Sequence, residues 1–361
     1  MNLGANLKKE LSQINKEYLL ATYKFNKNQY NQTKVTNVTK KEKPLFVIKW
    51  GPPASGKSSE GMRKVIEELG PSIESYLNFN IDDLVESTKY FKKASGQVMN
   101  KLLGIESINN RNRKSVNNIT EFLSKASNNN ISSISQSYTN VRFTKNNKDE
   151  HLGMKMDNLL NQALDRQINI TFETTGSFGS GWPSWLWQKN ETGKLIYPNI
   201  KNYRIVLVIP LLPFETTWDR YKKRAAIMFK RGNGIRFFAR KSKFKELYMS
   251  SYSNFRNLLT DMPNQVSNVI MIDGASTLKY NVRNNHNKIQ TLLSIRKMVI
   301  SYIKKRTYVS GKVLPKHRWT PTFSKPLAAV AEKSRFKRTL RQGPTRKQGP
   351  TRKQGLTRTR L

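Results

Sequence analysis

The sequence predicts an α/β protein built on a mainly parallel β-sheet. Short apolar runs rich in β-branched residues alternate with stretches of helical periodicity, which is typical of strands joined by crossover helices. Polar or charged residues follow several of these runs, at the sheet edge where ligands bind in such folds. The clearest predicted strands are Leu45–Ile48, Ile168–Phe172, Tyr203–Ile209 and Asn268–Ile272, the last of the chain.

The first predicted strand leads into the segment Gly51–Ser58, which matches the phosphate-binding loop pattern G-x-x-x-x-G-K-[ST]. Glu60–Leu69 then has the pattern of a helix that ends at Gly70-Pro71. A strand, a glycine turn and a helix in this order direct backbone N–H groups and the positive helix end at phosphates. We therefore expect a nucleotide to contact Gly51, Pro52, Pro53, Ala54, Ser55, Gly56, Lys57, Ser58 and Ser59.

Residues 1–43 are polar, and we expect one short amphipathic helix there, followed by a linker. Residues 88–150 are rich in Asn, Ser and Lys and predict an insertion that is partly mobile and partly helical, at Val98–Leu103 and Ile119–Leu123. A further strand is expected at Tyr76–Asn80. Helices are expected from Leu152, from about Glu215 and around Ile289–Val299.

Phosphoryl transfer needs a base, magnesium and cationic charge, and each has a candidate after a predicted strand. Lys57 would reach the β- and γ-phosphates, and the Ser58 hydroxyl would hold Mg²⁺. Asp82 is a candidate general base or, alternatively, a helix N-cap. Glu173, followed by Thr174, would hold a substrate hydroxyl or support Mg²⁺, or it is a solvated loop acid.

A basic stretch at residues 220–245 offers the cationic charge. Arg220 and Arg224 are four residues apart, on one face of the predicted helix, where two guanidinium groups can clamp a γ-phosphate. Such a charge run is alternatively a solvated face or a nucleic-acid patch. The chain also has a cluster of three tryptophans, Trp182, Trp185 and Trp187. Their rings could stack on a base or sugar of the ligand; alternatively, they belong to the core.

Charge and composition limit the class of protein. The chain has 65 Lys and Arg against 24 Asp and Glu, a formal net charge of +41, which favours acidic or phosphorylated partners. It has no cysteine, which excludes disulfides, and His151, His286 and His317 show no metal-ligand spacing. Without a membrane-length apolar run or a signal peptide, we expect a soluble intracellular protein, in the cytoplasm rather than the nucleus.

The C-terminal region repeats Gln-Gly-Pro-Thr-Arg-Lys from Gln342 and again from Gln348. Gly and Pro at this spacing prevent a helix, so we expect a disordered tail. Its basic residues suit a nucleic-acid backbone, nuclear import or solubility alone. Removing the 11 basic residues of Lys333–Leu361 from the formal charge of +41 leaves +30, so the rest of the chain is basic too.

The order of these motifs resembles the zeta toxins and related zeta-type small-molecule kinases. The similarity covers about residues 44–275 without the insertion, and rests on the loop, Asn80-Ile-Asp82, Phe172-Glu-Thr-Thr175 and the arginine helix. It implies a three-layer P-loop kinase fold that uses ATP and Mg²⁺. It also implies that Asp82 is the base, that Glu173 orients substrate, and that Arg224, with Arg220 or Arg236, belongs to a lid over the γ-phosphate.

The best-known members of that family phosphorylate UDP-N-acetylglucosamine and are commonly restrained by a partner protein. The resemblance therefore implies a kinase acting on a hydroxyl of a small molecule such as a nucleotide sugar, with an inhibitory partner. The alternatives are a polynucleotide kinase-like enzyme and a nucleic-acid-binding P-loop protein. We expect a polar segment at 1–43, the kinase domain at 44–305 and the tail at 306–361.

Overall fold

The computed structural model describes residues 3–32, 43–103, 128–176, 184–230, 240–261, 265–273, 276–282 and, with gaps, 290–300. Several predicted features lie outside these ranges. They are the helix at Ile119–Leu123, Trp182, Arg236 with its glycine-containing loop, and the tail from residue 306 onwards.

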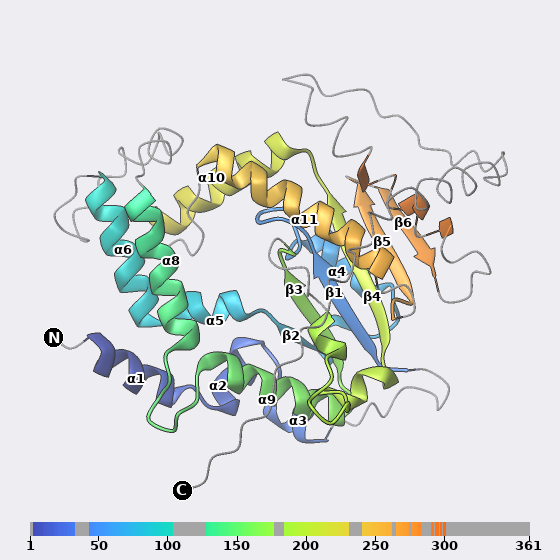
Figure 1. Ribbon diagram of the computed structural model, residues 1–361, viewed down its shortest axis with the longest axis horizontal. Coiled ribbons are helices and arrows are strands. Elements are labelled where there is room, and N and C mark those ends of the chain that lie inside the picture. The colour runs from blue at the N-terminus through green and yellow to red at the C-terminus, as the bar shows by residue number, and fades with distance from the viewer. Residues whose placement is uncertain are drawn as a thin grey trace, which may run out of the picture. The chain divides into compact units, whose positions relative to one another are not determined.

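The described strands form a six-stranded sheet in the order β2-β3-β1-β4-β5-β6, with the first five strands parallel (Figure 1). The α/β class with a mainly parallel sheet is thereby confirmed. The prediction that the strand at 268–272 is the last was wrong, because an antiparallel β6 pairs with it. The strands are β1 Leu45–Trp50, β2 Tyr76–Phe79, β3 Asn169–Thr174, β4 Arg204–Leu211, β5 Asn268–Asp273 and β6 Ser276–Asn281.

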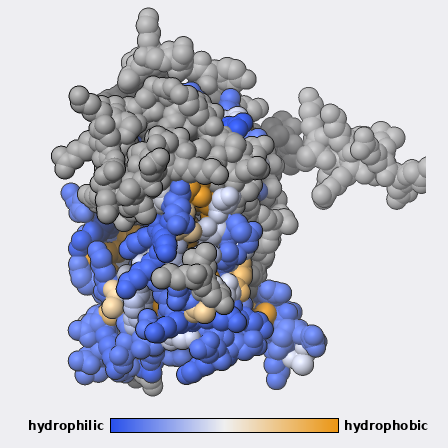
Figure 2. Space-filling model, turned by 90° about the vertical axis from the view of Figure 1, so that its left-hand side faces the viewer, coloured by the Kyte–Doolittle hydropathy of each residue, from blue (hydrophilic) through white to orange (hydrophobic). Residues whose placement is uncertain are grey.

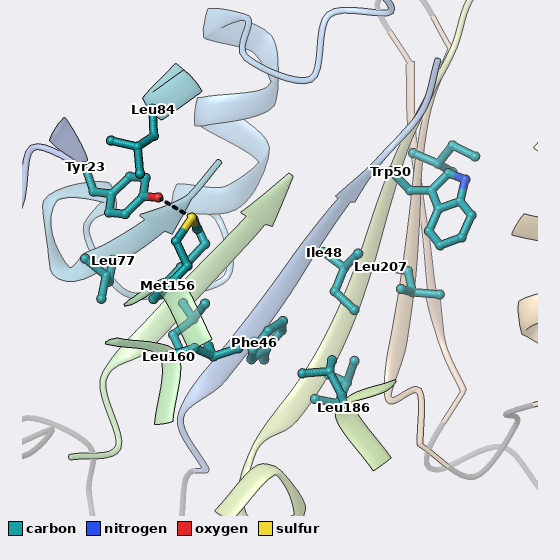
Figure 3. Close-up of a cluster of buried hydrophobic side chains, with 14 of the residues drawn as sticks. Tyr23, Phe46, Ile48, Trp50, Leu77, Leu84, Met156, Leu160, Leu186 and Leu207 are labelled. Atoms are coloured by element: carbon teal, nitrogen blue, oxygen red, sulfur yellow. Dashed lines mark hydrogen bonds between the residues drawn. The ribbon is translucent and has the colours of Figure 1, made fainter. Parts of the chain in front are cut away.

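The sheet is buried on both faces, as the alternation along β1 shows. Phe46, Ile48 and Trp50 point into a large apolar cluster, whereas Leu45 and Val47 belong to a smaller one on the opposite face (Figure 3). A strand with helices on both sides contains no polar face, which explains why its sequence is nearly continuous in apolar residues.

Helices cover both faces. On the side of the smaller cluster lies α4 (Glu60–Glu67), which contributes Met62, Val65 and Ile66. The larger cluster takes residues from α9 (Leu152–Asp165), α10 (Phe214–Lys230) and α11 (Lys241–Asp261). Short 3₁₀ turns lie at Ile73–Ser75, Ser184–Trp187 and Pro198–Asn202.

The N-terminal segment differs from its prediction. One helix and a linker were expected, but the chain forms α1 (Leu3–Gln13), α2 (Lys16–Thr22) and α3 (Lys27–Gln32). Leu19, Leu20, Tyr23, Phe25 and Tyr30 are buried in the larger cluster, where the Tyr23 hydroxyl donates to Met156 Sδ over 3.1 Å (Figure 3). The segment therefore folds into packed helices although most of its residues are polar, because its few apolar side chains find a surface to pack on.

The insertion forms a helical hairpin in the part that the structure describes. After α5 (Ile81–Ser87), α6 (Lys89–Leu103) packs beside α8 (Asn128–Phe143) (Figure 1). The helix expected at Val98–Leu103 is the end of α6, whereas α8 was not expected because Asn and Ser dominate it. On the face of the molecule that carries this hairpin, most of the described residues are hydrophilic, and the apolar ones are scattered (Figure 2).

Strand β4 continues through Pro210, where the sequence predicts its end. The pairing of β1 with β4 stops at Lys49 and Val208, because β1 then turns into the phosphate-binding loop. Pro210 lies beyond the end of that pairing, so the proline removes no hydrogen bond of the ladder between β1 and β4.

Gly176, just after β3, tests how tightly this region is packed. A Cβ there would lie 2.1 Å from Cε2 of the fully buried Trp50, and the backbone φ is +59°. Gly193 has φ +77° and open space where a Cβ would lie, so a substitution there measures the backbone strain alone. We expect Gly193→Ala to lower the free energy of unfolding by about 1 kcal/mol, and Gly176→Ala by a further ~1–3 kcal/mol, in urea unfolding. Equal losses for the two variants would contradict the clash with Trp50.

Candidate functional site

The loop Gly51–Ser58 begins where β1 ends and is tied to β3 by a hydrogen bond from Gly51 N to Thr174 O, 3.3 Å. Its turns use the left-handed region of backbone space at Ala54 (φ +60°) and Gly56 (φ +93°). Gly56 can adopt this conformation without strain, whereas Ala54 adopts it against the preference of residues with a Cβ. The Ser59 side chain then caps α4 by accepting a hydrogen bond from Met62 N, 3.3 Å.

Lys57 lies inside the curve of the loop. Its Nζ donates to the carbonyls of Gly51 (2.6 Å) and Pro52 (2.9 Å), and the residue is buried. An ammonium group with carbonyl partners on one side is placed to take phosphate oxygens as further acceptors.

At the end of the loop, the side chain of Ser58 meets that of Glu173, which is the last but one residue of β3. The Ser58 hydroxyl donates to Glu173 Oε2 over 2.9 Å, and the Nζ of Lys49 lies 3.6 Å from the same oxygen. Lys49 and Glu173 are paired in the register of β1 and β3, so the sheet itself brings these charges together. The solvated-acid alternative for Glu173 is therefore wrong, because its side chain is only 10% exposed.

Lys49 was missed by the sequence reasoning. Its Nζ also donates to Asn78 Oδ1 (2.9 Å), which accepts a second hydrogen bond from the Thr171 hydroxyl (2.7 Å). A lysine within an otherwise apolar buried strand was the available signal, because such a charge needs an acidic or polar partner.

A cavity of about 280 Å³ opens above the loop and brings most of the predicted residues together. Arg220 and Arg224 reach it from α10, and a Cβ at Gly56 would lie 3.3 Å from Arg220 Nη1. Arg224 also lies 3.7 Å from Glu86 Oε2 at the end of α5. The lining residues are Pro53, Ala54, Ser55, Gly56, Lys57, Ser58, Ser59, Glu173, Arg220 and Arg224.

The oxygen donors in this cavity fit magnesium. Mg²⁺ prefers oxygen ligands, and it usually takes one or two from the protein and the rest from water and phosphate. The Ser58 hydroxyl and the Glu173 carboxylate, 2.9 Å apart, form such a pair. The described residues contain no cluster of three or more His, Cys, Asp or Glu that could hold a metal ion.

Asp82 lies in the first turn of α5, outside the lining of this cavity. It is not the N-cap that the sequence left as an alternative, because Asn80 occupies that position and accepts from Asp82 N, 3.2 Å. The Asp82 carboxylate instead accepts a hydrogen bond at Oδ1 from the Tyr138 hydroxyl, over 2.6 Å.

The remaining candidates have structural contacts. The Thr174 hydroxyl accepts a hydrogen bond from Gly176 N (3.1 Å) and thereby holds the turn after β3. Trp187 packs against the larger core cluster, in agreement with the alternative that this tryptophan belongs to the core.

None of the described helices has the length and apolar character needed to cross a membrane. No protein-family model matches the chain, and no curated protein matches it. The chain is similar to a solved chain from the PezAT chromosomal toxin–antitoxin system of the human pathogen Streptococcus pneumoniae. That alignment covers 79% of this chain and 97% of the other, with 12% identity and a TM-score of 0.40.

The buried pair of Lys49 and Glu173 makes a stability prediction. Lys49→Met removes the cation that the register of β1 and β3 places beside the Glu173 carboxylate. We expect a loss of about 1–3 kcal/mol in the free energy of unfolding, because this carboxylate is only partly shielded where it lines the cavity. The double variant Lys49→Met/Glu173→Gln removes both charges and should recover most of that loss. Arg63→Met is the control, because its ion pairs with Glu67 and Glu74 are exposed and are together worth only about 0.5–1 kcal/mol. If the double variant is as unstable as Lys49→Met, the loss of stability does not come from the unpaired charge.

Proposed function

We propose that this chain is a kinase that transfers the γ-phosphoryl group of ATP to a hydroxyl group of a small molecule. One observation supports this most strongly: Lys57, Ser58, Glu173, Arg220 and Arg224 line a single cavity beside the phosphate-binding loop. Phosphoryl transfer is catalysed mainly by positioning and by neutralising phosphate charge, and these residue types supply both.

Each side chain then has a defined task on the donor side. The backbone N–H groups of the loop and the Lys57 ammonium bind the phosphates. Ser58 and Glu173 would hold Mg²⁺, which would supply positive charge to neutralise the phosphates. Arg220 and Arg224 contribute two further positive charges from α10, in the region where negative charge develops during transfer.

On the acceptor side, Asp82 takes the proton of the attacking hydroxyl. The acceptor oxygen forms a bond to the γ-phosphorus, the bond to the ADP oxygen breaks, and the products are ADP and a phosphate ester. We propose a nucleotide sugar such as UDP-N-acetylglucosamine as the acceptor, and a restraining partner protein, on the resemblance to zeta-type kinases alone.

The basic charge of the chain favours a second candidate, a kinase that acts on nucleic-acid ends. The formal net charge of +41 attracts a phosphate backbone, and such binding weakens strongly with salt. Labelled phosphate on oligonucleotide ends, rather than on a metabolite, would favour this acceptor. Nucleic-acid binding that survives Lys57→Ala, without phosphorylation of any acceptor, would instead indicate a binding protein.

The main test is transfer of labelled phosphate from ATP with Mg²⁺ to UDP-N-acetylglucosamine and to a metabolite extract, with the product identified by mass. Asp82→Asn should lower kcat by about 10²–10⁴-fold and leave ATP binding unchanged, because the base is lost and the loop is intact. Asp83→Asn is the matched control, an adjacent exposed acid in the same turn of α5, and should keep its activity. Transfer that survives Asp82→Asn would refute the assignment of the base.

The arginines of α10 are tested in the same assay. Arg220→Met and Arg224→Met should each lower kcat by about 10²-fold, because each removes a charge beside the transferring phosphoryl group. Lys223→Met removes an exposed cation from the same helix that does not line the cavity, and should change little. If all three variants lose activity equally, the effect is the general charge of α10 and not a contact with phosphate.

A further inference from the structure

The inserted hairpin contacts the helix that contains the candidate base. The Tyr138 hydroxyl of α8 donates to Asp82 Oδ1 over 2.6 Å, across 56 positions of the sequence. This contact lies outside the lining of the cavity above the phosphate-binding loop. An element with no predicted role in catalysis therefore touches the residue to which the proposed mechanism assigns the acceptor proton.

Tyr138 is held in place by its neighbours. It lies on the same face of α8 as Ile134 and Val141, which are both buried and are spaced four and three residues from it. Its ring meets the fully buried Phe91 of α6 edge to face, with centroids 6.4 Å apart. A ring packed in this way has few alternative rotamers, so its hydroxyl has a defined position.

The base of the hairpin is fixed to the N-terminal helices. Both carboxylate oxygens of Glu10 in α1 accept hydrogen bonds at the start of α6, from Lys89 N (2.6 Å) and Tyr90 N (3.0 Å). These are backbone groups that a helix leaves without a partner in its own first turn, and a negative charge there also complements the helix dipole. Asn140 Nδ2 donates to the Tyr90 hydroxyl (3.3 Å) and links the two helices of the hairpin.

We propose that Tyr138 is a positioning residue for Asp82, and that the insertion thereby completes the acceptor side of the site. The inference rests on the proposed kinase function. A carboxylate on a short helix rotates freely about its side-chain bonds unless a partner holds it. The hydrogen bond from Tyr138 restricts the rotation of the Asp82 carboxylate, and we expect this to keep its orientation toward the attacking hydroxyl constant.

The test is the variant Tyr138→Phe, which keeps the packed ring and removes only the hydroxyl. With UDP-N-acetylglucosamine, or with the acceptor identified in the metabolite extract, we expect kcat to fall about tenfold or more. The KM for ATP should stay the same, because neither Tyr138 nor Asp82 lines the donor cavity. If the variant only disrupted the hairpin, a lower kcat with an unchanged KM for ATP would not be expected.

The control is Tyr90→Phe, which removes a hydroxyl from the same hairpin and leaves the contact with Asp82 in place. It should leave kcat unchanged, and urea unfolding of both variants shows that each is folded. Equal activity of Tyr138→Phe and the wild type, or equal losses in the two variants, would overturn the inference and leave the kinase function intact. A wild-type chain that phosphorylates no acceptor overturns the proposed function instead.

Discussion

The phosphate-binding loop depends on a buried ion pair beneath it. Lys49 is the last but one residue of β1, and its ammonium group lies 3.6 Å from Glu173 on the neighbouring strand. Two charges removed from water are tolerated only with good partners, and here Asn78 and Ser58 supply them. The same carboxylate therefore compensates a core lysine and contacts the serine assigned to magnesium. A change in either strand would alter the position of the loop.

Strand order accounts for how distant segments meet at this point. Because β1 lies between β3 and β4, the loop after β1 is flanked by the ends of both neighbours. Strand β3 brings Glu173, and the chain after β4 continues into α10, which brings Arg220 and Arg224. A parallel sheet collects the residues that follow its strands at one edge, so the site arises from topology as much as from the motif.

The N-terminal helices and the inserted hairpin pack around α5. Glu10 caps α6, Tyr138 of α8 contacts Asp82, and the Tyr18 hydroxyl hydrogen-bonds with Ser87 Oγ over 3.1 Å. Burial raises the pKa of Tyr23, and the nearby carboxylates of Asp83 and Asp82 raise it further, so this phenol stays protonated. The phosphate-binding loop thus follows a local sequence pattern, whereas the surroundings of Asp82 are built from contacts between segments far apart in the sequence.

Elements with a local signal could be predicted from the residues alone. The glycine loop, the apolar strands and the amphipathic helix α9 depend on residues close together in the chain, and the α/β class followed from their alternation. Four other features come from contacts between distant segments: the pairing of Lys49 with Glu173, the contact of Tyr138 with Asp82, the packing of α2 and α3, and the additional strand β6. These depend on which surfaces meet after folding, and the polar composition of residues 1–43 and 88–150 conceals the few apolar side chains that determine it.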